Sequence, residues 1–133
     1  MKYLLRREEG TSLVELALLL PLFLLLILGV FDFGNGFNTY LGMTNAAREG
    51  AVWIARFPDD RAGMNERMEQ ELARVGMGLG NVTLSVVPDK LTYEAGEKVT
   101  VQITHPYPLM FGAVTKHASL TLRTKTTMKI LNQ

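Results

Sequence analysis

Residues 6–23 read RREEGTSLVELALLLPLF, and this stretch decides the architecture of the chain. A cluster of charges is followed by a glycine, a threonine and a long apolar run. The apolar segment from Leu13 to Phe33, about 21 residues, is roughly 31 Å long as a helix. The hydrocarbon core of a bilayer is ~30 Å thick. The sequence therefore predicts one transmembrane helix over residues 13–33.

The distribution of basic residues predicts how this helix is oriented. Lys2, Arg6 and Arg7 precede the apolar run, and the first basic residue after it is Arg48. The positive-inside rule places the N-terminus in the cytoplasm and everything after about Gly34 outside it. A cleaved secretory signal is disfavoured, because the run is longer than a typical signal and no A-x-A site follows it.

The helix is expected to continue beyond the membrane, to residue 57. Pro58 is the first firm stop signal. Pro21 lies inside the apolar run and is expected to bend the helix, which membrane helices tolerate. Residues 34–36, Gly-Asn-Gly, leave a break just outside the bilayer as an open alternative. The extension carries a stripe spaced by three or four residues, formed by Tyr40, Met43, Ala47, Ala51 and Ile54.

Glu15 is unexpected at the start of the apolar run. An ionisable side chain in such a segment is expected to have a partner, unless it reaches back to the lipid headgroups. If the chain is cut between Gly10 and Thr11, a new α-amine appears one helical turn from Glu15. That amine is cationic near neutral pH. Its pairing with Glu15, in the same chain or a neighbour, would set the axial register between packed helices.

This combination of features resembles the type IV prepilin pattern: a basic leader, Gly10, and a glutamate at the fifth position of the shortened chain. More narrowly, GTSLVELALLLPLFLLLILGVFDFG followed by TNAAREGA resembles the TadE-like family, the pilin-like proteins of tight-adherence (Tad/Flp) pilus systems. The resemblance implies that residues 1–10 are a cytoplasmic leader and that a prepilin peptidase cuts between Gly10 and Thr11. It also implies that Glu15 and the helix containing Pro21 mediate assembly.

The block NAAREG, residues 45–50, lies on the helical extension. Ala46 and Ala47 leave a smooth surface that another helix can approach closely. Arg48 and Glu49 are adjacent, so they point to different sides of the helix and cannot pair well with each other. The resemblance favours contacts between subunits through these four residues, whereas the alternative is a solvated helix surface.

Residues 58–133 predict a small extracytoplasmic α+β head. Asp60 is a plausible N-cap for a short helix. A stripe at helical spacing on that helix, more plausible as core than as a partner surface, comprises Met64, Met68, Leu72 and Val75. Alternation with period two then predicts three antiparallel strands within residues 82–87, 98–105 and 118–129. Leu120 and Leu122 are expected to face inward. The apolar stretch 105–114 is expected either to fold onto the sheet or to be an exposed patch for a partner or the membrane surface.

Composition excludes several classes of function. The 133 residues contain 14 Lys and Arg against 13 Asp and Glu, so the charge balance does not suggest nucleic acid as a partner. There is no cysteine, which excludes disulfides and thiolate chemistry. His105 and His117 have no clustered companions, so neither a metal nor another cofactor is expected. No nucleophile-elbow or phosphate-binding motif is present, and the chain is not expected to be an enzyme.

The sequence thus favours a structural minor pilin or pseudopilin of the inner membrane, initiating or capping a filament. By resemblance, its partners would be the major pilin, other minor pilins, the prepilin peptidase and the inner-membrane assembly platform with its secretion ATPase, besides membrane lipids. The alternative is an uncleaved single-pass membrane protein that presents a small binding module outside. A membrane-anchored enzyme is the least favoured reading.

Overall fold

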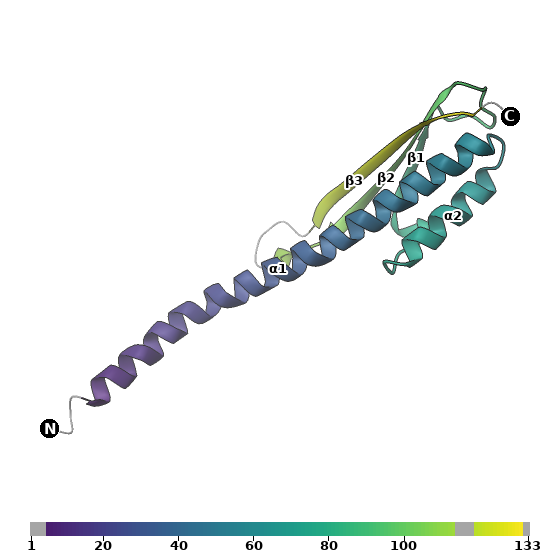
Figure 1. Ribbon diagram of the computed structural model, residues 1–133. Helices are drawn as coiled ribbons and strands as arrows, with labels where there is room; N and C mark the ends of the chain where they lie inside the picture. The colour runs from purple at the N-terminus through teal and green to yellow at the C-terminus, as the bar shows by residue number, and fades with distance from the viewer. Residues whose placement is uncertain (1–4, 114–118, 132–133) are drawn as a thin grey trace.

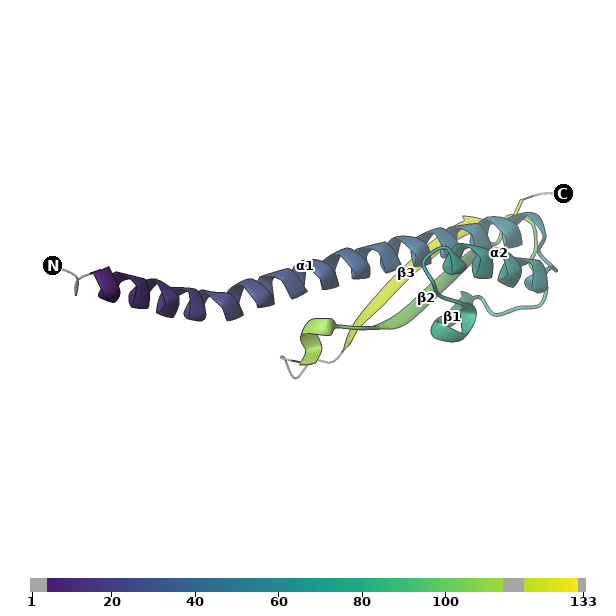
Figure 2. The same cartoon turned by 90° about the horizontal axis from the view of Figure 1, so that it is seen from below.

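The computed structural model describes residues 5–113 and 119–131, and a single long helix organises them (Figure 1). Helix α1 spans Leu5–Arg56, 52 residues. It continues without interruption through residues 34–36, so the alternative of a break there does not hold. The helix also passes through Pro21, and Figure 2 shows a gradual bow over its N-terminal half. Lys2 and His117 lie outside the described residues.

The head contains a three-stranded antiparallel sheet, as the period-two pattern predicts. The strands are β1 (Thr83–Val87), β2 (Lys98–Pro108) and β3 (Ser119–Lys129), in the order β1-β2-β3. Strands β2 and β3 pair over their full length, from Lys98 opposite Lys129 to Pro108 opposite Ser119. Both strands run alongside the C-terminal half of α1 (Figure 1). Together with the two helices they confirm the α+β architecture.

Helix α2, Arg61–Ala73, turns back beside α1 and completes the core. Its methionine stripe faces inward as predicted, because Met64, Met68 and Leu72 are almost fully buried. The same core takes Val99, Val101 and Ile103 from β2 and Met43, Ala46, Ala47, Ala51 and Ile54 from α1. Single glycines allow the two helices to approach closely. A Cβ atom at Gly50 would lie 2.6 Å from the Met68 sulfur, and one at Gly42 would lie 2.5 Å from a methyl group of Val75.

The expected inward face of β3 is only partly correct. Leu122 is half-buried, but Leu120 is 53 % exposed. Thr124 occupies the buried position instead, and its hydroxyl lies 3.2 Å from that of Thr44 on α1. The buried apolar core on α1 begins at Met43. Leu120 lies outside it, beside the part of α1 that contains Phe33, and therefore remains exposed.

Asp60 caps α2 and also fixes the end of α1. One carboxylate oxygen accepts a hydrogen bond from the Gly63 backbone N–H at 2.8 Å, and the other accepts one from Trp53 Nε1 at 3.0 Å. We expect Asp60→Ala to lower the free energy of unfolding of the head by ~1–2 kcal/mol, the usual cost of losing an N-cap. Thermal unfolding followed by Trp53 near-UV circular dichroism measures this. Asp59→Ala, an exposed neighbour, should be neutral; an equal loss in both variants would contradict the capping role.

Candidate assembly surface

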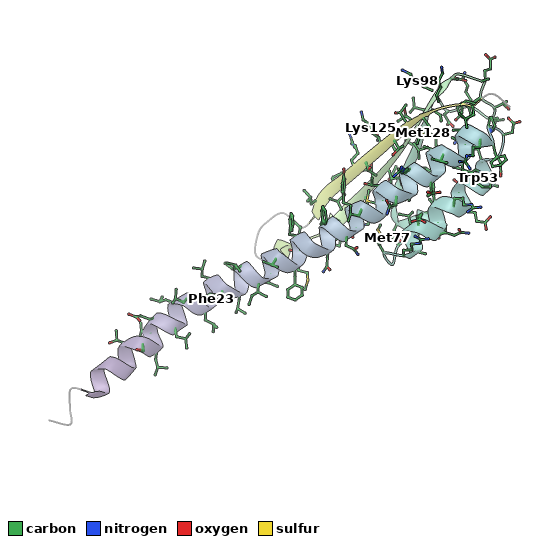
Figure 3. All side chains as sticks on the ribbon, viewed as in Figure 1. Phe23, Trp53, Met77, Lys98, Lys125 and Met128 are labelled. Atoms are coloured by element: carbon green, nitrogen blue, oxygen red, sulfur yellow. The ribbon has the colours of Figure 1, made fainter. Side chains whose placement is uncertain are left out.

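Helix α1 is divided into a free half and a half that is packed against the head. Residues 11–31 are exposed except Leu25 and Leu28, which are half-buried. Figure 3 shows their side chains, Phe23 among them, projecting from the helix with no other element around it. Among the described residues this is the one helix long and apolar enough to cross a membrane. The free half is therefore a candidate membrane span with an exposed apolar surface.

The predicted cleavage and register residues lie at the start of this free half. Gly10 and Thr11 are both helical within α1. Glu15 lies one turn after Thr11 and is exposed. Among the side chains that the structure describes, the Glu15 carboxylate has no hydrogen-bond or ion-pair partner. Residues at positions i and i+4 share one helix face, so an amine at Thr11 would lie on the face that carries Glu15.

The block NAAREG is split between the core and the surface. Ala46 and Ala47 are 0 % exposed, packed inside the chain's own head. The core that encloses them is built with side chains of α2 and β2 of the same chain. Their burial removes them from the surface available to another subunit, so the expected contact between subunits through these two alanines needs correction. Arg48 and Glu49 are exposed, and neither forms an ion pair within the described part of the chain.

A junction between the head and the free half of α1 was missed by the sequence analysis. Asp32 is only 6 % exposed, and its Oδ1 accepts a hydrogen bond from the Met110 backbone N–H at 2.8 Å. Met110 begins a short 3-10 helix, η2 (Met110–Ala113), that follows β2. The Tyr107 ring packs on α1 at Gly36, where a Cβ atom would lie 3.5 Å from the ring. Asp32 is the first charged residue after the apolar run, and this position in the sequence could have indicated a contact with the head.

The stretch 105–114 does not fold onto the sheet, and the alternative of an exposed patch holds in part, at Met110. Residues up to Pro108 belong to β2, and Tyr107 and Leu109 are half-buried beside α1 rather than folded onto the sheet. Met110 is 60 % exposed. The side chain of Phe111 and the residue Val114 lie outside what the structure describes. The contact is made with α1 because β2 continues along the helix beyond the core.

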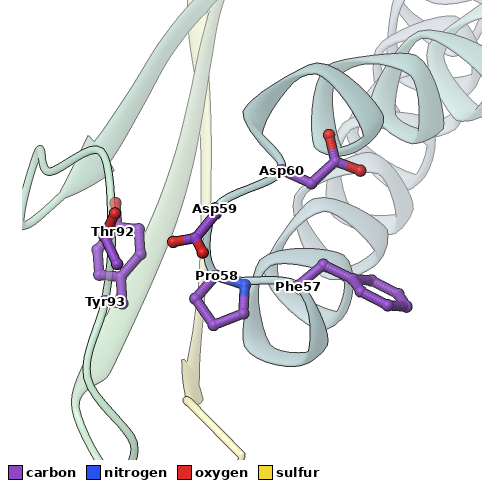
Figure 4. A pocket seen from close by; sticks show the side chains of 6 residues that line it. All are labelled: Phe57, Pro58, Asp59, Asp60, Thr92 and Tyr93. Carbon is purple, nitrogen blue, oxygen red and sulfur yellow. The ribbon is translucent and has the colours of Figure 1, made fainter.

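The opposite end of the head carries a shallow open pocket of about 360 Å³ (Figure 4). It is lined by Phe57, Pro58, Asp59, Asp60, Thr92 and Tyr93. Both carboxylate oxygens of Asp60 are already used by Trp53 and Gly63. No group of three or more potential metal ligands exists among the described residues.

The loop beside that pocket is held by ion pairs. Arg61 Nη2 donates to Asp89 Oδ1 at 2.7 Å and to the Tyr93 hydroxyl at 3.0 Å. Lys90 Nζ donates to Glu97 Oε1 at 2.6 Å. The hydrogen bond from Lys90 lowers the pKa of Glu97, and the same bond raises the pKa of Lys90. Both groups are therefore charged at neutral pH and hold the loop against the sheet.

The similarity to known proteins lies within helix α1, over its free half and most of its packed half. Residues 10–52 match the family model for TadE-like protein. The resemblance to the TadE-like family is confirmed over these residues. The TadE-like segment begins at Gly10, contains Glu15 and the NAAREG block, and ends within α1. The comparisons with curated proteins and with solved structures gave no match. Over these residues, the match supports the similarity to the pilin-like proteins of tight-adherence pilus systems.

Proposed function

We propose that this chain is a structural minor pilin or pseudopilin of a tight-adherence pilus system. It inserts in the inner membrane through α1 with its N-terminus in the cytoplasm, and a prepilin peptidase cuts it between Gly10 and Thr11. The shortened chain assembles with the major pilin and other minor pilins on the inner-membrane platform, which a secretion ATPase drives. The role is to initiate or cap the filament.

The observation that carries this proposal is the division of α1. One unbroken helix of 52 residues, roughly 78 Å long, joins an exposed apolar half to a half packed in the head. A simple anchor needs no rigid connection, and a flexible linker would serve it. A continuous helix transmits axial force from the membrane segment to the head, as extraction of a subunit into a filament requires.

The geometry at the start of the free half supports cleavage as the step that enables assembly. Before the cut, the leader holds Arg6 and Arg7 close to the membrane segment. After the cut, these charges are gone and the Thr11 amine lies on the face of Glu15. A carboxylate and an amine in low dielectric specify one axial arrangement of packed helices. Removing the leader therefore both releases the helix from its cytoplasmic tether and creates its docking partner.

The exposed pair Arg48 and Glu49 supports a second contact between subunits. Both side chains point away from the core that Ala47 and Gly50 form with α2. The positive charge of Arg48 and the negative charge of Glu49 are both exposed on α1. Each can pair with an opposite charge on a neighbouring subunit. This contact would add specificity to the register that Glu15 sets.

The N-terminal residue of the protein isolated from cells tests the proposal. We expect an intact mass and an N-terminal sequence that start at Thr11, because the leader is removed before assembly. Gly10→Leu should block this removal and accumulate the full-length chain, whereas Leu18→Val, in the exposed apolar run, should be processed normally. A chain that starts at Met1 in assembled, functional cells would contradict the proposal and leave the uncleaved membrane protein as the better description.

A further inference from the structure

The membrane-proximal end of the head lies level with the predicted membrane segment. Asp32 is about 28 Å along the helix from Leu13, at the far edge of a hydrocarbon core of ~30 Å. The 2.8 Å hydrogen bond from the Met110 backbone N–H to Asp32 places the start of η2 at the same level. Figures 1 and 2 show η2 and the adjoining ends of β2 and β3 as the part of the head nearest the N-terminus.

At this level, the exposed surface is apolar both on helix α1 and on the head. On the helix, Phe33 is 76 % exposed and Phe37 is 54 % exposed, and their rings stack with centroids 6.2 Å apart. On the head, Met110 is 60 % exposed and Leu120 is 53 % exposed. Exposed apolar side chains that cluster in one patch usually mark a surface that another molecule or a membrane covers. The clustering of these four side chains at one end of the head therefore calls for an explanation.

Two apolar grooves run between α1 and the head, one at the level of Asp32 and one that reaches to Tyr40, about 12 Å farther along the helix. One, of about 270 Å³, is lined by Gly29, Asp32, Phe33, Tyr107, Leu109 and Leu120. The other, of about 210 Å³, is lined by Phe33, Gly36, Phe37, Tyr40, Leu120 and Leu122. The first groove reaches Gly29 in the exposed apolar half of α1, Phe33 and Leu120 line both grooves, and one tyrosine lines each. Tyrosines concentrate where membrane meets water, because the ring is apolar and the hydroxyl is polar.

We propose that this end of the head, Tyr107 to Met110 with Leu120, is embedded in the outer boundary of the bilayer. Lipid acyl chains fill the groove beside Gly29 and Asp32, and the Asp32–Met110 hydrogen bond holds the head at that depth. Bilayer lipid is the occupant because this groove continues the apolar surface of the membrane span at Gly29. The inference requires only that α1 spans a bilayer; it depends on neither cleavage nor pilus assembly.

The burial of Asp32 fits this position. A carboxylate at the edge of the hydrocarbon needs a partner or water. The head supplies a backbone N–H and leaves the carboxylate only 6 % exposed. The contact thus shields the one acidic group of this region from lipid and orients the head relative to the membrane at the same time.

Depth-dependent fluorescence quenching tests the proposal, and the absence of cysteine makes single-cysteine labelling clean. The full chain carrying Met110→Cys, labelled with a nitrobenzoxadiazole dye, is reconstituted in vesicles of phosphatidylcholine and phosphatidylglycerol. These vesicles contain lipids with a nitroxide quencher at the headgroup, at carbon 5 or at carbon 12 of the acyl chain. Phe23→Cys serves as the control within the membrane. Leu91→Cys, at an 85 % exposed residue on the distal loop, serves as the control in water.

We expect the Met110 label to be quenched several-fold more strongly than the Leu91 label, and best by the headgroup and carbon-5 quenchers. The Phe23 label should respond best to the carbon-12 quencher. A Met110 label that behaves like the Leu91 label would overturn the proposal. Blue-shifted Met110 emission that lipid quenchers leave unchanged would mean that a second copy of the chain covers the grooves, and would also overturn it. An unquenched Phe23 label would show that α1 does not span, and the inference would fail at its premise.

A second pair of variants tests the role of Asp32 on the Met110→Cys background. Asp32→Asn keeps a side-chain oxygen that accepts the Met110 hydrogen bond, and the quenching profile should be retained. Asp32→Leu removes the acceptor, and the profile should shift toward that of the Leu91 label. Trp53 near-UV circular dichroism checks that the head is folded in both variants. An unchanged profile in Asp32→Leu would refute the claim that this bond sets the depth.

Discussion

Pilus assembly should be lost when Glu15 is replaced by valine, while the head stays folded and the leader is still removed. The proposed cut between Gly10 and Thr11 would create an amine that has no other partner of opposite charge in the apolar run, since residues 16–31 carry none. Leaving one member of a buried ion pair alone costs ~3–5 kcal/mol. Docking in the correct register should therefore weaken by at least about a hundredfold, since ~1.4 kcal/mol corresponds to tenfold.

The measurement is the number of surface filaments in cells whose only copy of the gene carries the variant. The membrane fraction is probed in parallel for the amount of protein and for removal of the leader. Leu18→Val is the matched control, because it changes an exposed side chain on the same turn region without a charge. Normal filament numbers in Glu15→Val cells that contain processed protein would remove the register role of the carboxylate.

Local periodicity was sufficient to predict the elements of the head. Val99, Val101 and Ile103 alternate with polar residues, and all three are fully buried. The spacing of Met64, Met68 and Leu72 predicted the buried face of α2 in the same way. Such patterns work because a half-buried strand or helix must place its apolar side chains on one side.

Periodicity could not predict which element covers a buried face. Ala47 was expected to lie on a surface for another helix, but it is buried in a core that α1, α2 and β2 of the same chain build together. Leu120 follows the correct alternation, yet it lies beyond the core and is exposed. The Asp32–Met110 contact joins residues 78 positions apart. A contact of that separation depends on how far β2 extends along α1, which no local pattern records.

Ala47→Leu should lower the thermal stability of the head strongly, whereas a change at the neighbouring Arg48 should not. Ala47 is 0 % exposed in a close-packed core that also contains Met43 and Ala51. Ala47→Leu adds three carbons there, and overpacking of this kind costs ~1–3 kcal/mol. For a head of this size, each ~1 kcal/mol lowers the melting temperature by ~4–8 °C. Trp53, the single tryptophan, packs 4.6 Å from the Phe57 ring and reports the transition.

Arg48→Ala is the matched variant, because it changes the next residue on the exposed side of the same turn. We expect its melting temperature to stay close to wild type, since surface substitutions away from special contacts change stability by about 0.5 kcal/mol or less. Filament number should nevertheless fall in Arg48→Ala, because this side chain is proposed to contact a neighbouring subunit. An unchanged melting temperature in Ala47→Leu would mean that this alanine faces another subunit after all. Normal filaments in Arg48→Ala would instead make residues 48–49 a solvated helix surface and leave Glu15 as the main determinant of docking.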